Sequence, residues 1–76
     1  MSDLPLLTGK QVGKIISKLG YEYVKHTGNH MTFINKNNHQ KIIIPDHGSE
    51  KIGFGLLNKI IKKDLGITRE EFLELL

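Results

Sequence analysis

The sequence lacks cysteine altogether, and arginine supplies only one of its 11 basic residues, the rest being lysine. Without cysteine, the chain can hold neither disulfides nor thiolate zinc sites, and it offers no thiol nucleophile. Because small extracellular domains usually need disulfides for stability, we expect this chain to act in a reducing compartment, the cytoplasm.

Long apolar segments are missing as well. The longest uninterrupted apolar run comprises residues 42–44, far short of the roughly 20 residues that a membrane-spanning helix needs. The opening stretch "MSDLPLL" carries an acidic residue and a proline where a secretion signal has basic residues and a long apolar run. We therefore expect a soluble protein without a membrane partner.

What is present is a small basic chain. Its 76 residues have a formal net charge of +3 and show no repeat, linker or low-complexity segment, which predicts one domain over residues 1–76 with a modest core. Residues 1–7 are expected to form a short, partly ordered lead-in. A small basic domain often binds nucleic acid, but the arrangement of its charges says more than their sum.

A first helix is predicted to begin near Thr8, because "TGKQ" fits a capping box and apolar residues at 12, 15, 16 and 19 follow at helical spacing. Gly20 is placed to end this helix. Lys10, Lys14 and Lys18 share the opposite side of the predicted helix. This lysine row is either a phosphate-facing ridge or an ordinary solvated face, and the spacing alone does not decide between them.

Three strands are expected next, over residues 21–26, 30–35 and 40–44. In the second, Met31 and Phe33 share one face, while the residues at 30, 32 and 34 share the other. The polar stretch "NKNNH", residues 35–39, predicts a turn, because asparagines tolerate the left-handed conformation and their side chains bond the nearby backbone. The second and third strands therefore read as a hairpin.

The remaining residues predict two more helices. A glycine-containing loop over 45–55 leads to a helix at about 56–64 that ends before Gly66, and a Thr68–Glu71 capping box opens a short terminal helix. The resulting fold class is α+β, in α-β-β-β-α order plus the terminal helix. Two helices would cover one face of a three-stranded antiparallel sheet and leave the other face open. Such a fold does not by itself decide the function.

Four histidines could carry chemistry: His26, His30, His39 and His47. A metal site is not expected, because zinc needs three or four converging ligands and few acidic residues lie near these histidines. His30 stands out, because it follows the flexible Gly28 at the start of a strand and can transfer a proton near neutral pH. From the residues alone, a partly exposed strand histidine with a hydrogen-bond partner is the preferred interpretation of His30.

Four stretches together resemble the HicA family of toxins, the small ribonucleases of toxin–antitoxin modules. They are "LGY" at 19–21, "GNHMTF" at 28–33, "IIIPDHG" at 42–48 and "GITREEFLEL" at 66–75. The resemblance implies a fold like that of double-stranded-RNA-binding domains. It also implies an active-site histidine in a Gly-x-His motif, which corresponds here to Gly28, Asn29 and His30.

The resemblance further implies a metal-independent endoribonuclease without a cofactor, which cleaves mRNA with His30 as general acid or base. A HicB-type antitoxin protein is the implied partner. The residues that we expect to contact RNA are Gly28, Asn29, Lys10, Lys14, Lys25, His47 and Lys51. His26 and His47 are alternative candidates for a second proton-transfer group.

Two residues depart from the family pattern. Asn29 stands where serine is common, and Leu56 follows Gly55 where threonine is common, so a helix cap is lost. Two rival functions stay open: a non-catalytic RNA-binding module of the same fold, and a protein-interaction domain that uses the open sheet face.

Overall fold

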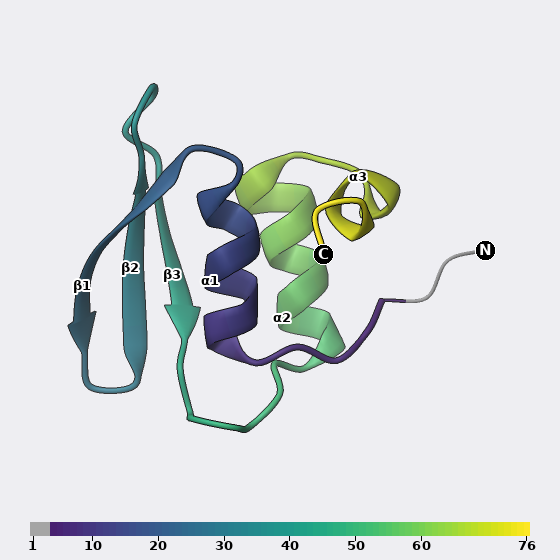
Figure 1. Ribbon diagram of the computed structural model, residues 1–76, viewed down its shortest axis with the longest axis horizontal. Helices are drawn as coiled ribbons and strands as arrows, with labels where there is room; N and C mark the ends of the chain where they lie inside the picture. Colours follow the sequence, from purple (N-terminus) through teal and green to yellow (C-terminus); the bar gives the residue numbers. More distant parts are fainter. Residues whose placement is uncertain (1–3) are drawn as a thin grey trace.

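The computed structural model describes residues 4–76 and confirms the α+β class with its α-β-β-β-α order and a terminal helix (Figure 1). The second helical segment has two parts, an α-helix followed by a π-helix labelled η1. The bounds are α1 (Gly9–Ser17), β1 (Tyr21–Thr27), β2 (His30–Asn35), β3 (Lys41–Pro45), α2 (Phe54–Lys59), η1 (Ile60–Leu65) and α3 (Arg69–Leu73).

Helix α1 begins as its sequence predicts. The Thr8 hydroxyl accepts from the backbone N–H of Gln11, and the Gln11 side chain accepts from the backbone N–H of Thr8, which completes the capping box. The helix ends at Ser17, and Gly20 takes a left-handed φ of 92° shortly afterwards. Within residues 4–76, no helix is both long and apolar enough to cross a bilayer.

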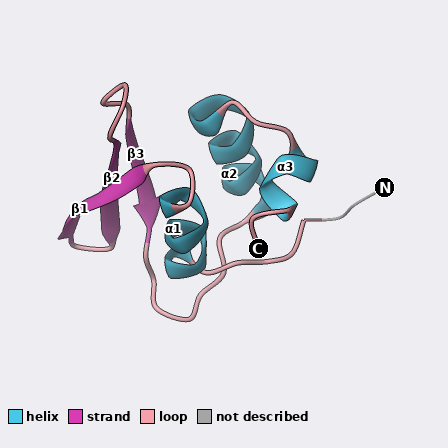
Figure 2. Cartoon of the chain, turned by 45° about the horizontal axis from the view of Figure 1, so that its top comes forward, coloured by secondary structure: helices cyan, strands magenta, loops and turns pink. Residues whose placement is uncertain are grey.

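The three strands form one antiparallel sheet in the order β1-β2-β3. Residues that pair directly across strands share a face, so the buried Met31 and Phe33 define the face that meets the helices, together with Ile42 and Ile44. Figure 2 shows the helices gathered on one side of the sheet. The opposite face is open, as the sequence predicts, and we call it the open face.

Strand β1 contains a β-bulge that the sequence analysis did not predict. Tyr23 pairs with Phe33, whereas Lys25 pairs with Thr32, so Val24 is an extra residue without a partner of its own. Beyond the bulge, the alternation of β1 is shifted by one position. Lys25 therefore joins the open face and His26 joins the helix side, the reverse of what simple alternation from Tyr21 gives.

The turn between β2 and β3 forms where it was expected, but a different residue takes the left-handed conformation. His39 has a φ of 61°, and among the described residues it is the only non-glycine residue with a positive φ. Asn35 instead uses its side-chain oxygen to accept from the backbone N–H groups of Asn37 and Asn38. The expected bonds from asparagine side chains to the turn backbone are therefore confirmed, while the left-handed residue is His39 and not an asparagine.

The second helical segment differs from its prediction at both ends. α2 starts at Phe54, two residues early, and its N-cap is Gly53, which forms no side-chain cap. Leu56, the position where threonine is common, lies inside the helix, so the expectation that its substitution removes the helix cap is wrong. From Ile60 the backbone continues as the π-helix η1 until Gly66, whose φ is 66°. The apolar spacing of so short a segment does not distinguish α-helical from π-helical turns.

The two ends of the described chain both join the core. Leu4 and Leu7 are buried although a partly ordered lead-in was expected, while residues 1–3 lie outside the described part. At the other end, the predicted Thr68–Glu71 capping box is present at the start of α3. Hydrogen bonds from the backbone and side chain of Thr68 lower the pKa of Glu71.

The close packing of α1 against the end of β3 can be tested by replacing a glycine at the contact with alanine. A Cβ at Gly9 would overlap the carbonyl oxygen of Pro45, so we expect Gly9→Ala to lower the free energy of unfolding by about 1–3 kcal/mol. Gly55 lies in α2 with open space around it, so Gly55→Ala should instead raise it by about 0.5–1 kcal/mol. Urea unfolding of both variants measures the contrast, and equal shifts would contradict the close packing.

Candidate active site on the open sheet face

His30 is the first residue of β2 and is exposed. Its direct cross-strand neighbours are Thr27 on β1 and Pro45 on β3. Only Gly28 and Asn29 separate it from Thr27, and Gly28 has a φ of 58°, a value that favours glycine. The sequence prediction that a glycine turn places His30 at the start of a strand is confirmed.

A shallow depression of about 720 Å³ covers the open face next to His30. Thr27 and Thr32 contribute hydroxyl groups, and the exposed Ile43 and Val24 contribute apolar surface. Two ammonium groups, from Lys25 and Lys41, also line it. The depression thus combines a titratable ring, cations, hydroxyls and apolar side chains on one rigid sheet.

The register of the sheet sets the spacing of these groups. Lys25, Thr32 and Ile43 lie in register across the three strands, next to the row that contains His30. Lys25 and His30 are therefore diagonal neighbours, whose Cβ atoms typically lie roughly 7–8 Å apart. Lys41 pairs with Ile34, four residues along β2 from His30 and so about 13 Å away. Of these two cations, Lys25 lies much closer to the imidazole.

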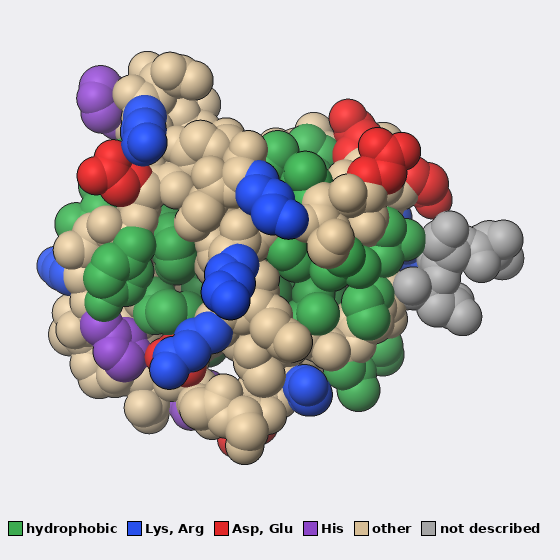
Figure 3. All heavy atoms as spheres, in the orientation of Figure 1, with side chains coloured by type: hydrophobic (Ala, Val, Ile, Leu, Met, Phe, Trp, Pro, Cys, Tyr) green, Lys and Arg blue, Asp and Glu red, His purple; other side chains and the backbone are tan. Residues whose placement is uncertain are grey.

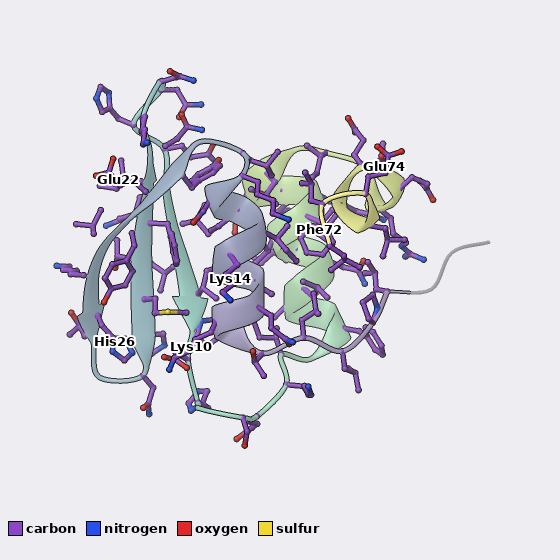
Figure 4. All side chains as sticks on the ribbon, in the orientation of Figure 1. Lys10, Lys14, Glu22, His26, Phe72 and Glu74 are labelled. Atoms are coloured by element: carbon purple, nitrogen blue, oxygen red, sulfur yellow. The ribbon has the colours of Figure 1, made fainter. Side chains whose placement is uncertain are left out.

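The lysine row of α1 lies on a different surface. Lys10 and Lys14 are exposed on α1, on the helix side of the sheet, and neither lines the depression beside His30. Figure 3 shows lysine side chains in a row over this helix, and Figure 4 labels Lys10 and Lys14 there. Lys18 donates from its ammonium group to the carbonyl oxygen of Leu75 at 2.7 Å.

The other candidate residues gather at the end of the sheet where β1 ends and β2 begins. His47 is exposed in the loop that follows Pro45, the cross-strand neighbour of His30. Lys51 forms a backbone bridge with Thr8, just before α1. His39 stands apart, in the turn at the opposite end of the hairpin.

His26 has an acidic partner that the sequence analysis missed. Its Nε2 lies 3.5 Å from Oδ2 of Asp46, whose side chain is only 8% exposed. Figure 4 labels His26 near the end of β1. His26 pairs with the buried Met31, so the two neighbouring histidines, His26 and His30, lie on opposite sides of the sheet. Within residues 4–76, no group of three or more histidine or acidic residues is arranged to hold a metal ion.

In a comparison with protein-family models, the chain matches the HicA toxin of bacterial toxin–antitoxin systems over residues 9–67. This range covers well over half of the chain and includes the Gly28–His30 turn and the whole sheet. The chain belongs to the HicA toxin family. Searches of curated proteins and of solved structures gave no match.

The matched range of this HicA-family chain runs from the first residue of α1 to just beyond η1 and leaves α3 outside. It contains the open-face depression and also the pair of His26 and Asp46. The sequence could not pair His26 with Asp46, because the side of the sheet on which His26 lies depends on the unpredicted bulge in β1.

Proposed function

We propose that this toxin is an endoribonuclease that cleaves mRNA on the open sheet face, with His30 as its proton-transfer group. The observation that carries the proposal is the exposed imidazole of His30 on the same face as Lys25, at the edge of a depression. An imidazole can exchange a proton near neutral pH, and an ammonium group stabilises negative charge on phosphate. The Gly-x-His arrangement within the HicA match supports the same assignment.

The reaction that fits these groups is attack of a ribose 2′-OH on the adjacent phosphate. Neutral His30 would take the proton of the 2′-OH as the O2′–P bond forms, while the P–O5′ bond breaks. The products are a 2′,3′-cyclic phosphate and a strand with a 5′-OH. Lys25 is the cation best placed to stabilise the phosphate in the transition state, because its side chain shares the face of His30.

The leaving 5′ oxygen needs a proton, and the two sequence candidates differ in their surroundings. His26 lies on the helix side with Asp46, away from the open face. His47 is exposed in the loop that follows Asp46, at the end of the sheet where His30 stands. We therefore favour His47 as the acid that protonates the leaving 5′ oxygen. We assign Gly28 and Asn29 to contacts between their backbone and the RNA.

The proposal includes a HicB-type antitoxin that acts with this toxin in the cytoplasm. The described surface is suited to an acidic protein partner, because Lys25 and Lys41 flank exposed apolar residues on the open face. RNA and antitoxin would compete if both used this face. The proposal needs neither a cofactor nor a metal ion.

Incubation of the purified protein with RNA tests the proposal directly. We expect cleavage that continues in the presence of a chelator and leaves 2′,3′-cyclic phosphate ends. Binding without any cleavage would instead support the RNA-binding module, and absence of both would support a protein-interaction domain. Cleavage that a chelator stops would contradict the metal-independent mechanism.

The salt dependence of RNA binding tests which lysines contact phosphate. Lys25→Gln should weaken binding and reduce the slope of log affinity against log salt by about 1, because one phosphate contact is lost. Lys59→Gln, at the exposed end of α2, is the matched control and should leave the slope unchanged. The same slope, measured for Lys10→Gln and Lys14→Gln, then shows whether the lysine row of α1 also contacts RNA. An unchanged slope in Lys25→Gln would argue against RNA on the open face.

A further inference from the structure

Asp46 is a buried acidic residue at the end of the sheet, directly after β3. Its Oδ1 accepts from the backbone N–H of Gly48 at 3.2 Å, and its Oδ2 lies 3.5 Å from Nε2 of His26. Its own backbone N–H donates to the carbonyl oxygen of Asn29 at 2.6 Å. One residue therefore connects the end of β1, the β1–β2 turn and the loop that carries His47.

The bulge in β1 is what makes the contact with His26 possible. Because Val24 is an extra residue, His26 lies on the helix side, where Asp46 is buried. With simple alternation from Tyr23, the same side chain would lie on the open face, beyond the reach of Asp46. The bulge thus places His26 beside the carboxylate of Asp46, while the regular alternation of β2 places His30 at the depression.

The contacts of Asp46 hold the turn from two sides. His26 precedes the turn by one residue, and Asn29 is its second residue, so both flanks of the flexible Gly28 are attached to Asp46. His30 follows immediately. A histidine at the end of such a turn moves with it, and small displacements of a catalytic group slow a reaction strongly. Burial of a carboxylate is costly unless its oxygens have partners, and here Oδ1 accepts from the backbone N–H of Gly48 while Oδ2 faces His26.

We propose that Asp46, paired with His26, is a positioning residue that fixes the β1–β2 turn and thereby the imidazole of His30. The inference rests on the proposed ribonuclease function for its kinetic consequence. Its structural part, restraint of the turn by Asp46, can be measured without any activity.

The test uses Asp46→Asn, His26→Gln and the double variant of the full chain. We expect Asp46→Asn to lower kcat about 10-fold, because the amide keeps the size of the side chain but loses the charge that attracts His26. Affinity for a 2′-O-methyl RNA, which lacks the nucleophile, should stay within about twofold of wild type. The double variant should be no slower than Asp46→Asn, since both changes remove one contact.

Glu50→Gln is the matched control, because it neutralises an exposed acidic residue in the same loop. Its kcat should equal that of the wild type. Hydrogen exchange of the backbone amides of residues 28–30 is measured on the same samples and should become about 10-fold faster in Asp46→Asn but not in Glu50→Gln.

Two outcomes would overturn the inference. One is exchange in the turn at the wild-type rate in Asp46→Asn, whether or not the protein cleaves RNA. The other is a double variant in which the two losses of kcat multiply, because the residues would then act independently. A wild-type protein that does not cleave RNA would end the proposed function, while the exchange rates would still decide whether Asp46 restrains the turn.

Discussion

His30→Ala should lose RNA cleavage almost completely, with kcat reduced by about 10²–10⁴-fold. The reason is that the imidazole is the titratable group on the open face that can exchange a proton with the 2′-OH near neutral pH. Stability should change little, because the side chain is exposed at the start of β2 and no core residue depends on it. Affinity for 2′-O-methyl RNA should also be nearly unchanged. The cleavage rate and the unfolding midpoint are measured on the same preparation.

A second histidine supplies the control for this prediction. His39 lies at the far end of the β2–β3 hairpin and has a positive φ, so His39→Asn removes an imidazole while respecting the left-handed backbone. This variant should cleave RNA at the wild-type rate. A folded His30→Ala protein that is as active as His39→Asn would rule out His30 as the proton-transfer group.

The parts of the fold that were predictable are those that local sequence specifies. The capping boxes at Thr8 and Thr68 are each complete within four residues, and both form as expected. The faces of β2 follow from simple alternation, because this central strand is regular along its whole length. His30 could therefore be placed on the open face from the sequence alone, while its catalytic role stays a prediction.

The rest depends on contacts between segments that are distant in the sequence. No residue type marks the bulge at Val24, which is defined only by the pairing of β1 with β2. Because the bulge reverses the faces of Lys25 and His26, alternation along β1 alone could not place either side chain. The partner of His26 lies 20 residues away, after a third strand. Composition could suggest a basic surface, but only the sheet register shows which lysine shares a face with His30.

Phe72→Ala should lower the free energy of unfolding by about 3–5 kcal/mol, the cost typical of emptying a fully buried aromatic site. Phe72 is completely buried in the core although it belongs to the short helix α3, outside the residues that match the HicA family (Figure 4). A domain of this size has a modest total stability, so the loss should leave much of the protein unfolded at 37 °C. Urea unfolding followed by circular dichroism measures the change.

Leu76→Ala is the control, because Leu76 is 57% exposed at the end of the chain and should contribute little. Equal unfolding free energies for Phe72→Ala and Leu76→Ala would mean that α3 is not part of the core.

Phe72→Ala and His30→Ala should both lose cleavage, but for different reasons. Phe72→Ala would regain cleavage in a stabilising osmolyte, because its active site is intact whenever the chain is folded. His30→Ala should stay inactive, because it is folded already and lacks the proposed proton-transfer group.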